Sequence, residues 1–389
     1  MGLNLQKGAQ TTSFNNSSPD TRVRFVDPRI FFAQAEIAPL NALMERIKRS
    51  VRATSIKPEW VEKDMGTPST TINGAIDDSA ATTTIKVAAG TGVMFDVNDI
   101  AWIPSATGGE QVLVTDRTTD TLTVVRNWGS AGAAAAADGA QIVKLSSSYA
   151  ENATSGVGVK IKPSMPYNVT QIHRTPIELS RSEMQIKRYE RGEKGARQDA
   201  RRDAMILHLE GVERSFINGD LKEDVSTNRR VAKGLLRYIT THREDMLGSM
   251  TKGKFDSFLK AVMVNGGGKY VLAASGSFME ALHAEVLSKS NMNITPATKE
   301  WGLDVTRYLS PFGKCDIFYH RILSQMLENN YGGCAMLLDM SLVTKYYLQK
   351  MVLRENIQAN DADGFKDEYL EECCAALHNE ANHGFIYNV

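Results

Sequence analysis

The feature that most constrains the fold is a stretch from about Glu183 to Asn218 that holds no proline and many helix-forming residues. At 1.5 Å per residue, a helix of about 30 residues is about 45 Å long, which exceeds the needs of an ordinary globular domain. The sequence Asn218-Gly219-Asp220 ends it. Small and apolar residues recur along it at helical spacing and form one stripe: Ala196, Ala200, Ala204, Leu207 and Gly211.

The segment 73–145 has a different pattern. Turn signals such as Asn73-Gly74, Gly108-Gly109 and Asp138-Gly139 separate short β-branched runs. This alternation of turns and runs predicts a small all-β module. The predicted strands are Thr83–Val87, Ile100–Ile103, Gln111–Thr115, Thr121–Arg126 and Gln141–Leu145.

The last third of the chain alternates between helical and extended patterns, which predicts an α/β or α+β domain over residues 253–350. A mainly β segment follows over residues 343–389. The predicted helices are Phe255–Val264 and Phe278–Lys289, and the predicted strands are Tyr270–Ala274, Val305–Tyr308, Lys314–Tyr319, Cys334–Leu338, Val343–Leu353, Tyr369–His378 and His383–Tyr387.

Charge is balanced overall but unevenly distributed. The 45 Lys and Arg equal the 45 Asp and Glu, which argues against a general nucleic-acid binder. Residues 181–243 hold 15 Lys and Arg against 10 Asp and Glu, whereas residues 355–380 hold 1 against 8. Such segregation fits surfaces of subunits that complement each other. From charge alone, a solvated helix face with ion pairs at i,i+4 is the favoured interpretation.

The composition excludes several classes of protein. Four cysteines in 389 residues form no disulfide framework, so a reducing compartment is expected. The polar residues 1–25 are interpreted as an arm rather than a signal peptide. No apolar run of about 18 residues is present, so we expect no membrane partner.

Each catalytic or ligand-binding motif that the sequence partly matches is incomplete. The segment 264–270 lacks the first glycine and the Ser/Thr of a phosphate loop. Cys374, His378 and His383 match no zinc spacing. Asp361-Ala362-Asp363-Gly364 has its glycine too early for a calcium loop. We therefore expect no enzyme, no cofactor and no metal site.

Three stretches carry a family resemblance. The first runs from Ala38-Pro39-Leu40 to Glu59-Trp60-Val61-Glu62, and the second is the β module between Thr82 and Val143. The third is the tail segment Leu377-His378-Asn379-Glu380-Ala381-Asn382-His383-Gly384, which is similar to a family segment L…RNE.AHG. In their order, these stretches resemble the major capsid proteins of tailed bacteriophages, and most closely the SU10-type major capsid protein family.

The resemblance implies an α+β fold of the Hong Kong 97 type. Its parts would be an arm and short helix (residues 1–50), an extended β-hairpin loop (51–180) with an all-β insertion (73–145), a peripheral domain with a long spine helix (181–250), an axial α/β domain (251–345) and a β tail that returns to the peripheral domain (346–389). Two consecutive cysteines in the tail strand, Cys373 and Cys374, depart from the family pattern.

The resemblance also implies a function. The chain would assemble with itself into hexamers and pentamers of an icosahedral head shell around double-stranded DNA. Expected partners are a scaffolding protein, a portal and a cement protein docked on the insertion. The protein would be assembled in the host cytoplasm and located in the virion.

Six residues are candidates for contacts between subunits: Trp60, Glu62, Arg191, Lys194, Arg197 and Arg201. The four basic residues form a stripe on the long helix that would meet an acidic loop or tail of a neighbour, or else the packaged DNA. Zero net charge favours the contact with an acidic loop or tail of a neighbour. Trp60 would be an interface anchor or, equally, a core residue.

Three other classes remain open. An encapsulin uses the same fold for a cellular shell and would copurify with cargo. An adhesin or carbohydrate-binding protein built on the β module would carry a secretion signal. An enzyme with an unrecognised site would be a monomer with a small-molecule pocket.

Overall fold

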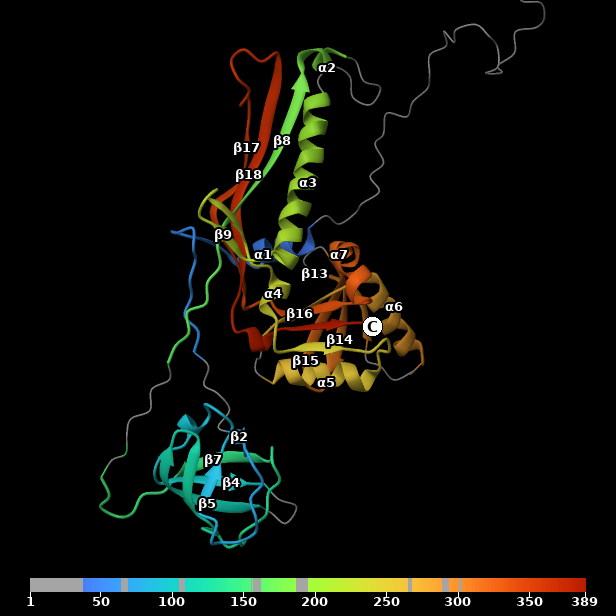
Figure 1. Ribbon diagram of the computed structural model, residues 1–389. Coiled ribbons are helices and arrows are strands. Elements are labelled where there is room, and N and C mark those ends of the chain that lie inside the picture. Colours follow the sequence, from blue (N-terminus) through green and yellow to red (C-terminus); the bar gives the residue numbers. More distant parts are fainter. Residues whose placement is uncertain are drawn as a thin grey trace, which may run out of the picture. The chain divides into compact units, whose positions relative to one another are not determined.

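The structure is a computed structural model of the 389-residue chain. It divides the chain into two compact units, Met1–Glu59 with Tyr167–Val389, and Trp60–Pro166 (Figure 1). The expected arm of residues 1–25 lies outside the described residues. Those described are 38–63, 69–104, 109–154, 156, 162–186, 195–264, 268–288, 294–300 and 303–389.

The first unit contains a four-stranded sheet in the order β1-β17-β18-β8. β1 runs parallel to β17, and the other neighbours are antiparallel. Pro176 lies in β8, an edge strand, where a missing backbone N–H is tolerated. The strands are β1 (Ser50–Arg52), β8 (Gln171–Ser180), β17 (Val343–Arg354) and β18 (Gly364–Leu377).

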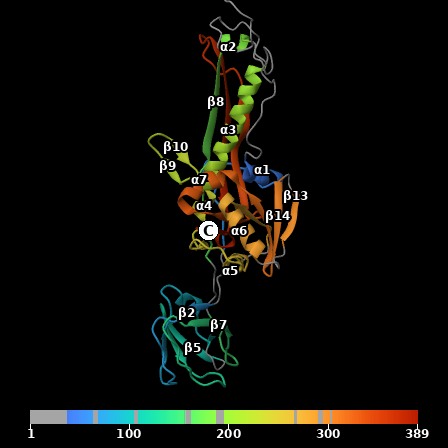
Figure 2. The ribbon, with the colours of Figure 1, turned by 90° about the vertical axis from the view of Figure 1, so that its right-hand side faces the viewer.

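The long helix α3 (Ala196–Asn218) lies along this sheet (Figure 2). A small apolar cluster of Ala204, Ile177 and Tyr369 joins α3 to β8 and β18. Because side chains alternate along a strand, Tyr369 and the residues two positions before and after it point to the same side, toward α3. These neighbours, Asp367 and Glu371, are charged, so the contact between helix and sheet is largely polar.

The prediction of one continuous helix from 183 to 218 is wrong. A short helix α2 (Arg181–Gln185) begins where Ser180 Oγ accepts the Glu183 N–H, and it ends at Ile186, whose backbone is extended. α3 starts after Gly195. The cap at Ser180 fixes where α2 begins, and Gly195 disfavours helix immediately before α3.

The first unit also contains a seven-stranded mixed sheet in the order β11-β19-β16-β12-β15-β14-β13. β12 is fully buried and pairs in parallel with β15 and antiparallel with β16. The strands are β11 (Arg243–Asp245), β12 (Tyr270–Ala274), β13 (Ile294–Glu300), β14 (Leu303–Ser310), β15 (Gly313–Tyr319), β16 (Ala335–Asp339) and β19 (Gly384–Tyr387).

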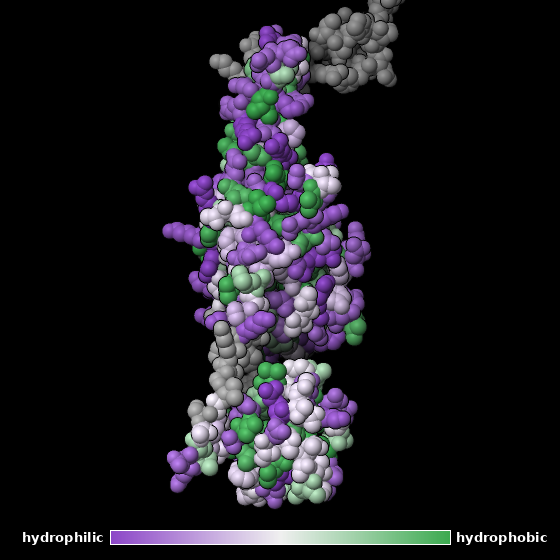
Figure 3. Space-filling model, turned by 60° about the vertical axis from the view of Figure 1, so that its left-hand side comes forward, coloured by the Kyte–Doolittle hydropathy of each residue, from purple (hydrophilic) through white to green (hydrophobic). Residues whose placement is uncertain are grey.

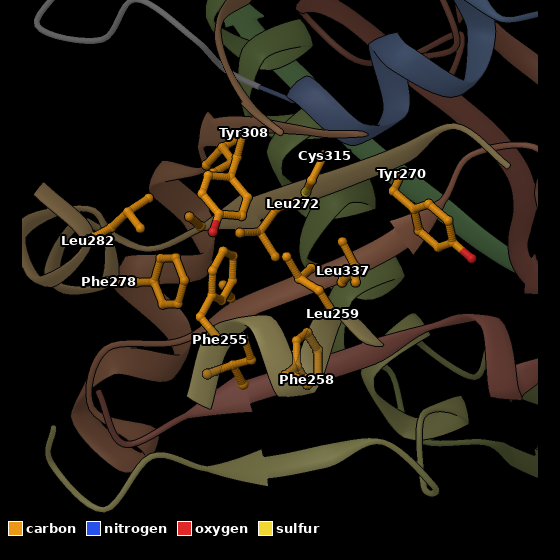
Figure 4. Packing of buried hydrophobic residues seen from close by; sticks show 14 of the residues in the cluster. Phe255, Phe258, Leu259, Tyr270, Leu272, Phe278, Leu282, Tyr308, Cys315 and Leu337 are labelled. Atoms are coloured by element: carbon orange, nitrogen blue, oxygen red, sulfur yellow. The ribbon is translucent and has the colours of Figure 1, made fainter. Parts of the chain in front are cut away.

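The helices of this part are α5 (Lys252–Met263), α6 (Gly276–Ser288) and α7 (Arg321–Tyr331). Figure 4 shows the core between α5, α6 and the sheet, where Phe255 packs with Tyr308 and Phe278 at centroid distances of 5.3 and 6.1 Å. The predicted α/β character of this region is present. The sequence analysis assigned neither α7 nor β13.

Smaller elements connect the two sheets. A two-stranded hairpin, β9 (Lys222–Asp224) and β10 (Arg229–Val231), follows α3. The remaining elements of the first unit are α1 (Pro39–Arg46), α4 (Leu235–Tyr238) and the 3₁₀ turn η2 (Glu380–Asn382).

The C-terminal β segment is shared by both sheets. Its expected return to a peripheral domain stays a prediction. β17 and β18 belong to the four-stranded sheet, but β19 inserts between β11 and β16 of the seven-stranded sheet. The reason is the turn through η2, which redirects the chain after β18.

The second unit is a six-stranded antiparallel sheet in the order β2-β7-β4-β5-β6-β3. A bridge between Ile72 and Val87 joins the two outer strands, with the Asn73 N–H donating to Lys86 O at 2.8 Å. The sheet thereby closes into a barrel and loses its open edges. Its elements are β2 (Ser69–Thr71), β3 (Thr84–Lys86), η1 (Gly92–Met94), β4 (Asp99–Ile103), β5 (Glu110–Thr118), β6 (Thr121–Val125) and β7 (Gln141–Ser147).

The barrel has a dry core of its own, built from alternate residues of each strand, including Ile85, Val112, Leu122 and Ile142. Each predicted strand of this module overlaps an observed one. Whether the barrel is an insertion in an extended loop, with the arm, loop, peripheral and axial boundaries given above, stays a prediction.

Surface polarity is mixed on the face that Figure 3 shows, where hydrophilic and apolar residues are interspersed over each unit. Among the described residues, no helix is both long and apolar enough to cross a membrane. The four cysteines are buried and unpaired.

Candidate functional site

Two of the predicted site residues lie on α3 and face their own chain. Arg197 clasps Asp367 of β18 with two hydrogen bonds, Nε to Oδ2 at 2.8 Å and Nη2 to Oδ1 at 2.6 Å. Arg201 Nε donates to the same Oδ2 at 2.8 Å. Burial alone would raise the pKa of Asp367, but the hydrogen bonds from Arg197, Asn356 N–H and Arg201 lower it to about 2.

The same arginines hold the connection between β17 and β18. Arg197 Nη2 donates to Asn356 Oδ1 at 2.7 Å, and Arg201 Nη1 lies 3.1 Å from Glu355 Oε1. The basic segment 181–243 and the acidic segment 355–380 therefore meet within one chain. A further contact of this stripe with a neighbouring copy stays a prediction, and Arg191 and Lys194 lie outside the described residues.

A buried polar cluster continues along this interface. Lys345 Nζ of β17 lies 2.7 Å from Glu371 Oε1 and donates to Asn41 Oδ1 of α1 at 2.8 Å. Burial would raise the pKa of Glu371, but His208 and Lys345 facing it lower that pKa to about 2. Burial favours the neutral form of Lys345, yet the facing carboxylates raise its pKa above the ordinary value. These contacts join α1 to both long strands.

Glu213 of α3 is a second junction. Its carboxylate accepts the backbone N–H groups of Leu40 and Asn41, at 2.7 and 2.9 Å, at the start of α1. Anionic groups are stabilised at this end of a helix. Its Oε1 also lies 3.0 Å from His320 Nε2, and both side chains are fully buried. The sequence analysis missed Glu213, since a lone glutamate on a charged helix gives no local signal.

The tail segment that carries the family resemblance links the two sheets. Glu380 accepts the N–H groups of Thr240 and Thr241 at 2.6 and 2.7 Å. The buried His383 accepts the Asp339 N–H through Nδ1 at 3.2 Å, and its Nε2 lies 3.2 Å from His378 O. Burial lowers the pKa of His383 to about 4. The segment thus has a structural role at the turn into β19.

The other two predicted residues lie at the start of the second unit. Trp60 is 8% exposed, and its Nε1 donates to Glu62 Oε1 at 2.7 Å. Backbone hydrogen bonds join Trp60 N to Pro166 O and Glu62 N to Ser164 O at 3.1 and 3.0 Å. The segments before and after the barrel therefore pair as an antiparallel ladder, which positions both side chains.

A buried ion pair organises the barrel loops. Arg126 and Glu110 are both fully buried and form two hydrogen bonds, of 2.7 and 2.6 Å. Glu110 also accepts the N–H groups of Asn127 and Ala134. Burial would raise the pKa of Glu110, but Arg126 and these amides lower it.

No cluster of three or more His, Cys, Asp or Glu side chains able to hold a metal ion occurs within the described ranges. The arrangement is one of internal charge pairing over extended surfaces. It is suited to rigid packing of elements, since the pairs that Arg197 and Arg201 form with Asp367 connect elements more than 160 residues apart in the sequence.

The sequence model of the SU10 major capsid protein family matches residues 7–389. The chain belongs to this family of bacteriophage major capsid proteins, which confirms the resemblance. A search of curated proteins finds no match.

Three solved structures are similar to this chain. The capsid asymmetric unit of cyanophage A-1(L) is 10% identical, with a TM-score of 0.53 over 94% of this chain and 97% of that one. The capsid of Myoviridae phage XM1 is 6% identical, with a TM-score of 0.48 over 94% and 97%. The SrpI encapsulin of Synechococcus elongatus is 12% identical, with a TM-score of 0.44 over 59% and 78%. The first of these shows a shared mixed helix-and-sheet fold.

Proposed function

We propose that this chain forms hexamers and pentamers that close an icosahedral head shell around double-stranded DNA. The observation that carries the proposal is the family match over residues 7–389. As a member of a capsid protein family, the chain is a component of the virion. The proposal further assigns a structural, non-enzymatic role and assembly in the host cytoplasm, with a scaffolding protein, a portal and a cement protein as partners.

The described contacts support a shell subunit. Ion pairs fix α3 against the four-stranded sheet, so the two can act as one rigid element. Shells are built from heterologous contacts between copies, which need extended and rigid surfaces rather than a pocket. In the Hong Kong 97 fold, α3 would be the spine helix and the seven-stranded sheet the axial domain.

The contacts between copies are proposed at the residues singled out from the sequence. Trp60 and Glu62 hold the ladder that leads into the second unit, so they would set the direction of that unit toward a neighbour. Arg197 and Arg201 have side chains 19% and 21% exposed. They would act mainly by fixing the β17–β18 connection that a neighbour contacts. Arg191 and Lys194 complete the proposed stripe.

Negative-stain electron microscopy of the purified protein, with light scattering on the same sample, tests the proposal. Shells, tubes or separate hexamers and pentamers are the expected result. Monodisperse monomers that persist with added scaffolding protein or crowding agent would overturn it. A cellular enzyme that copurifies inside the shells would instead support an encapsulin.

A further inference from the structure

A second group of cations lies where α1 ends and β1 begins. Residues 45–52 contain four Lys and Arg against one Glu. Arg46, Lys48 and Arg52 are exposed, and Arg49 is half-buried. In the part of the chain that the structure describes, none of these four forms an ion pair, unlike the arginines of α3. The segment therefore presents positive charge that this part of the chain does not neutralise.

These cations adjoin a cleft of about 470 Å³ between the end of α1 and β17. Lys48, Ser50, Tyr347 and Lys350 are among the residues that line it. Arg52 is the register partner of Tyr347, and Lys350 Nζ lies 5.0 Å from the centroid of the Tyr347 ring. Side chains from the turn after α1, from β1 and from β17 therefore bring positive charge to one place.

The acidic residues of the cleft do not cancel this charge. Glu45 and Glu371 line it, but both carboxylates face the buried Lys345 Nζ, at 3.1 and 2.7 Å. One of these two negative charges balances that ammonium group, and the other remains. The six cations at and beside the cleft exceed its two carboxylates, which leaves a net charge of +4: Arg46, Lys48, Arg49, Arg52, Lys345 and Lys350.

We propose that this cleft binds backbone phosphates of the duplex DNA inside the shell, an inference that rests on the proposed function. Duplex DNA carries one negative charge per about 1.7 Å of its axis, so it is the dense polyanion that a shell subunit meets. The Lys48 and Lys350 ammonium groups and the Arg52 guanidinium contact phosphate oxygens, and the Ser50 hydroxyl can donate beside them. Phosphate contacts carry no sequence information. Binding is therefore independent of sequence and sensitive to salt.

Fluorescence anisotropy with a labelled 20-base-pair duplex tests the inference on the purified full-length protein. The cleft variant is Lys48→Gln with Arg52→Gln and Lys350→Gln. The matched control removes three exposed cations elsewhere, through Lys86→Gln, Lys222→Gln and Arg229→Gln. Circular dichroism establishes that both variants are folded, and light scattering records their assembly state.

The cleft variant is expected to bind the duplex at least about tenfold more weakly at low salt. The slope of log affinity against log salt becomes less steep by about 2 to 3, because each lost phosphate contact removes about 0.9 from its magnitude. The control variant and a duplex of unrelated sequence behave like wild type. Equal weakening by both variants, or no duplex binding by wild type, would overturn the inference.

A third outcome assigns the cleft to another partner. If the cleft variant binds DNA normally but fails to form the particles seen for wild type, an acidic surface of a second copy occupies the cleft. That outcome overturns the inference and leaves the proposed function intact. If microscopy shows no shells for wild type, while duplex binding still depends on the cleft, the proposed function would be overturned instead.

Discussion

Glu213 Oε1 lies 3.0 Å from His320 Nε2 in a fully buried contact between α3 and the start of α7. His320 Nδ1 accepts the Leu323 N–H at 3.2 Å, so Nε2 carries the proton and donates to Glu213. The same carboxylate accepts two N–H groups at the start of α1. One side chain thus holds three helices that lie far apart in the sequence.

Replacing Glu213 by alanine should strongly destabilise the first unit. The substitution leaves two backbone N–H groups and one imidazole N–H buried without an acceptor, each at a cost of about 1–3 kcal/mol. We expect the free energy of unfolding to fall by about 3 kcal/mol or more. Glu213→Gln keeps one acceptor oxygen and should lose less.

Urea unfolding followed by far-ultraviolet circular dichroism measures this loss. Tryptophan fluorescence provides an internal reference that reports mainly on the second unit, because three of the four tryptophans, Trp60, Trp102 and Trp128, lie there. Glu223→Gln, at an exposed position on β9, is the control and should stay within about 0.5 kcal/mol of wild type. An unchanged stability of Glu213→Ala would contradict the role assigned to this carboxylate.

Asp367→Asn should loosen the β17–β18 connection from α3. The variant keeps the size of the side chain but removes the charge that faces Arg197 and Arg201. A hydrogen bond to a charged group contributes about 1.5–3 kcal/mol, and both arginines are partly exposed and can be hydrated. We expect a loss of about 2 kcal/mol and faster proteolysis near Glu355. A variant as resistant to protease as wild type would show that this pairing is dispensable.

Local patterns predicted much of the secondary structure for physical reasons. The strands of the barrel alternate buried and exposed residues, and β12 is an uninterrupted apolar run. The closure of the barrel at Ile72 and Val87 depends on a pairing between distant segments, which no local pattern encodes. α7 was missed although Ile322, Leu323 and Leu327 have helical spacing, because its N-cap is a histidine rather than a usual capping residue.

The charge pattern indicated which segments would interact, but not whether they belong to one chain or two. Asp367 and Glu371 are four residues apart on one strand, so both face α3. Lys345 reaches the same face from β17, and that meeting follows only from the register of two strands. Partners of this kind become visible only in the folded chain.

Stability should fall in acid in two stages. Burial lowers the pKa of His383 and of His173 to about 4 from 6.5. Between pH 6.5 and about 4, the unfolded chain binds protons that the folded chain does not, so the free energy of unfolding falls. Below about pH 4, protonation of Asp367 and Glu371, each with a pKa of about 2, lowers it further.

His383→Gln separates the two stages. Glutamine offers both a donor and an acceptor but does not titrate, so the variant should be less stable at pH 7 and lose less stability between pH 6.5 and 4. Urea midpoints measured across this range give the comparison. If wild type and variant show the same pH dependence, His383 does not contribute to the first stage.

Two glycines should respond to alanine in opposite directions. A Cβ at Gly384 would lie 2.5 Å from Phe258 Cζ and 2.9 Å from Val262 Cγ2, so Gly384→Ala overpacks the contact of β19 with α5 and costs about 1–3 kcal/mol. A Cβ at Gly211, inside α3, would meet no atom within 4 Å. Gly211→Ala should therefore stabilise by about 0.5–1 kcal/mol through helix propensity. Thermal unfolding of the two variants in parallel checks the opposite signs.

The barrel should fold as an isolated fragment of residues 60–166. It closes on itself without open edges, and its core of alternate strand residues is complete within the unit. The fragment is expected to show a cooperative unfolding transition by circular dichroism and tryptophan fluorescence.

Glu110→Ala should abolish this transition. It leaves Arg126 buried without its partner, and breaking such a pair costs about 3–5 kcal/mol, which is comparable to the whole stability of a small domain. Lys86→Gln, on the barrel exterior, is the matched control, and a fragment that unfolds without cooperativity would show that the barrel depends on the first unit.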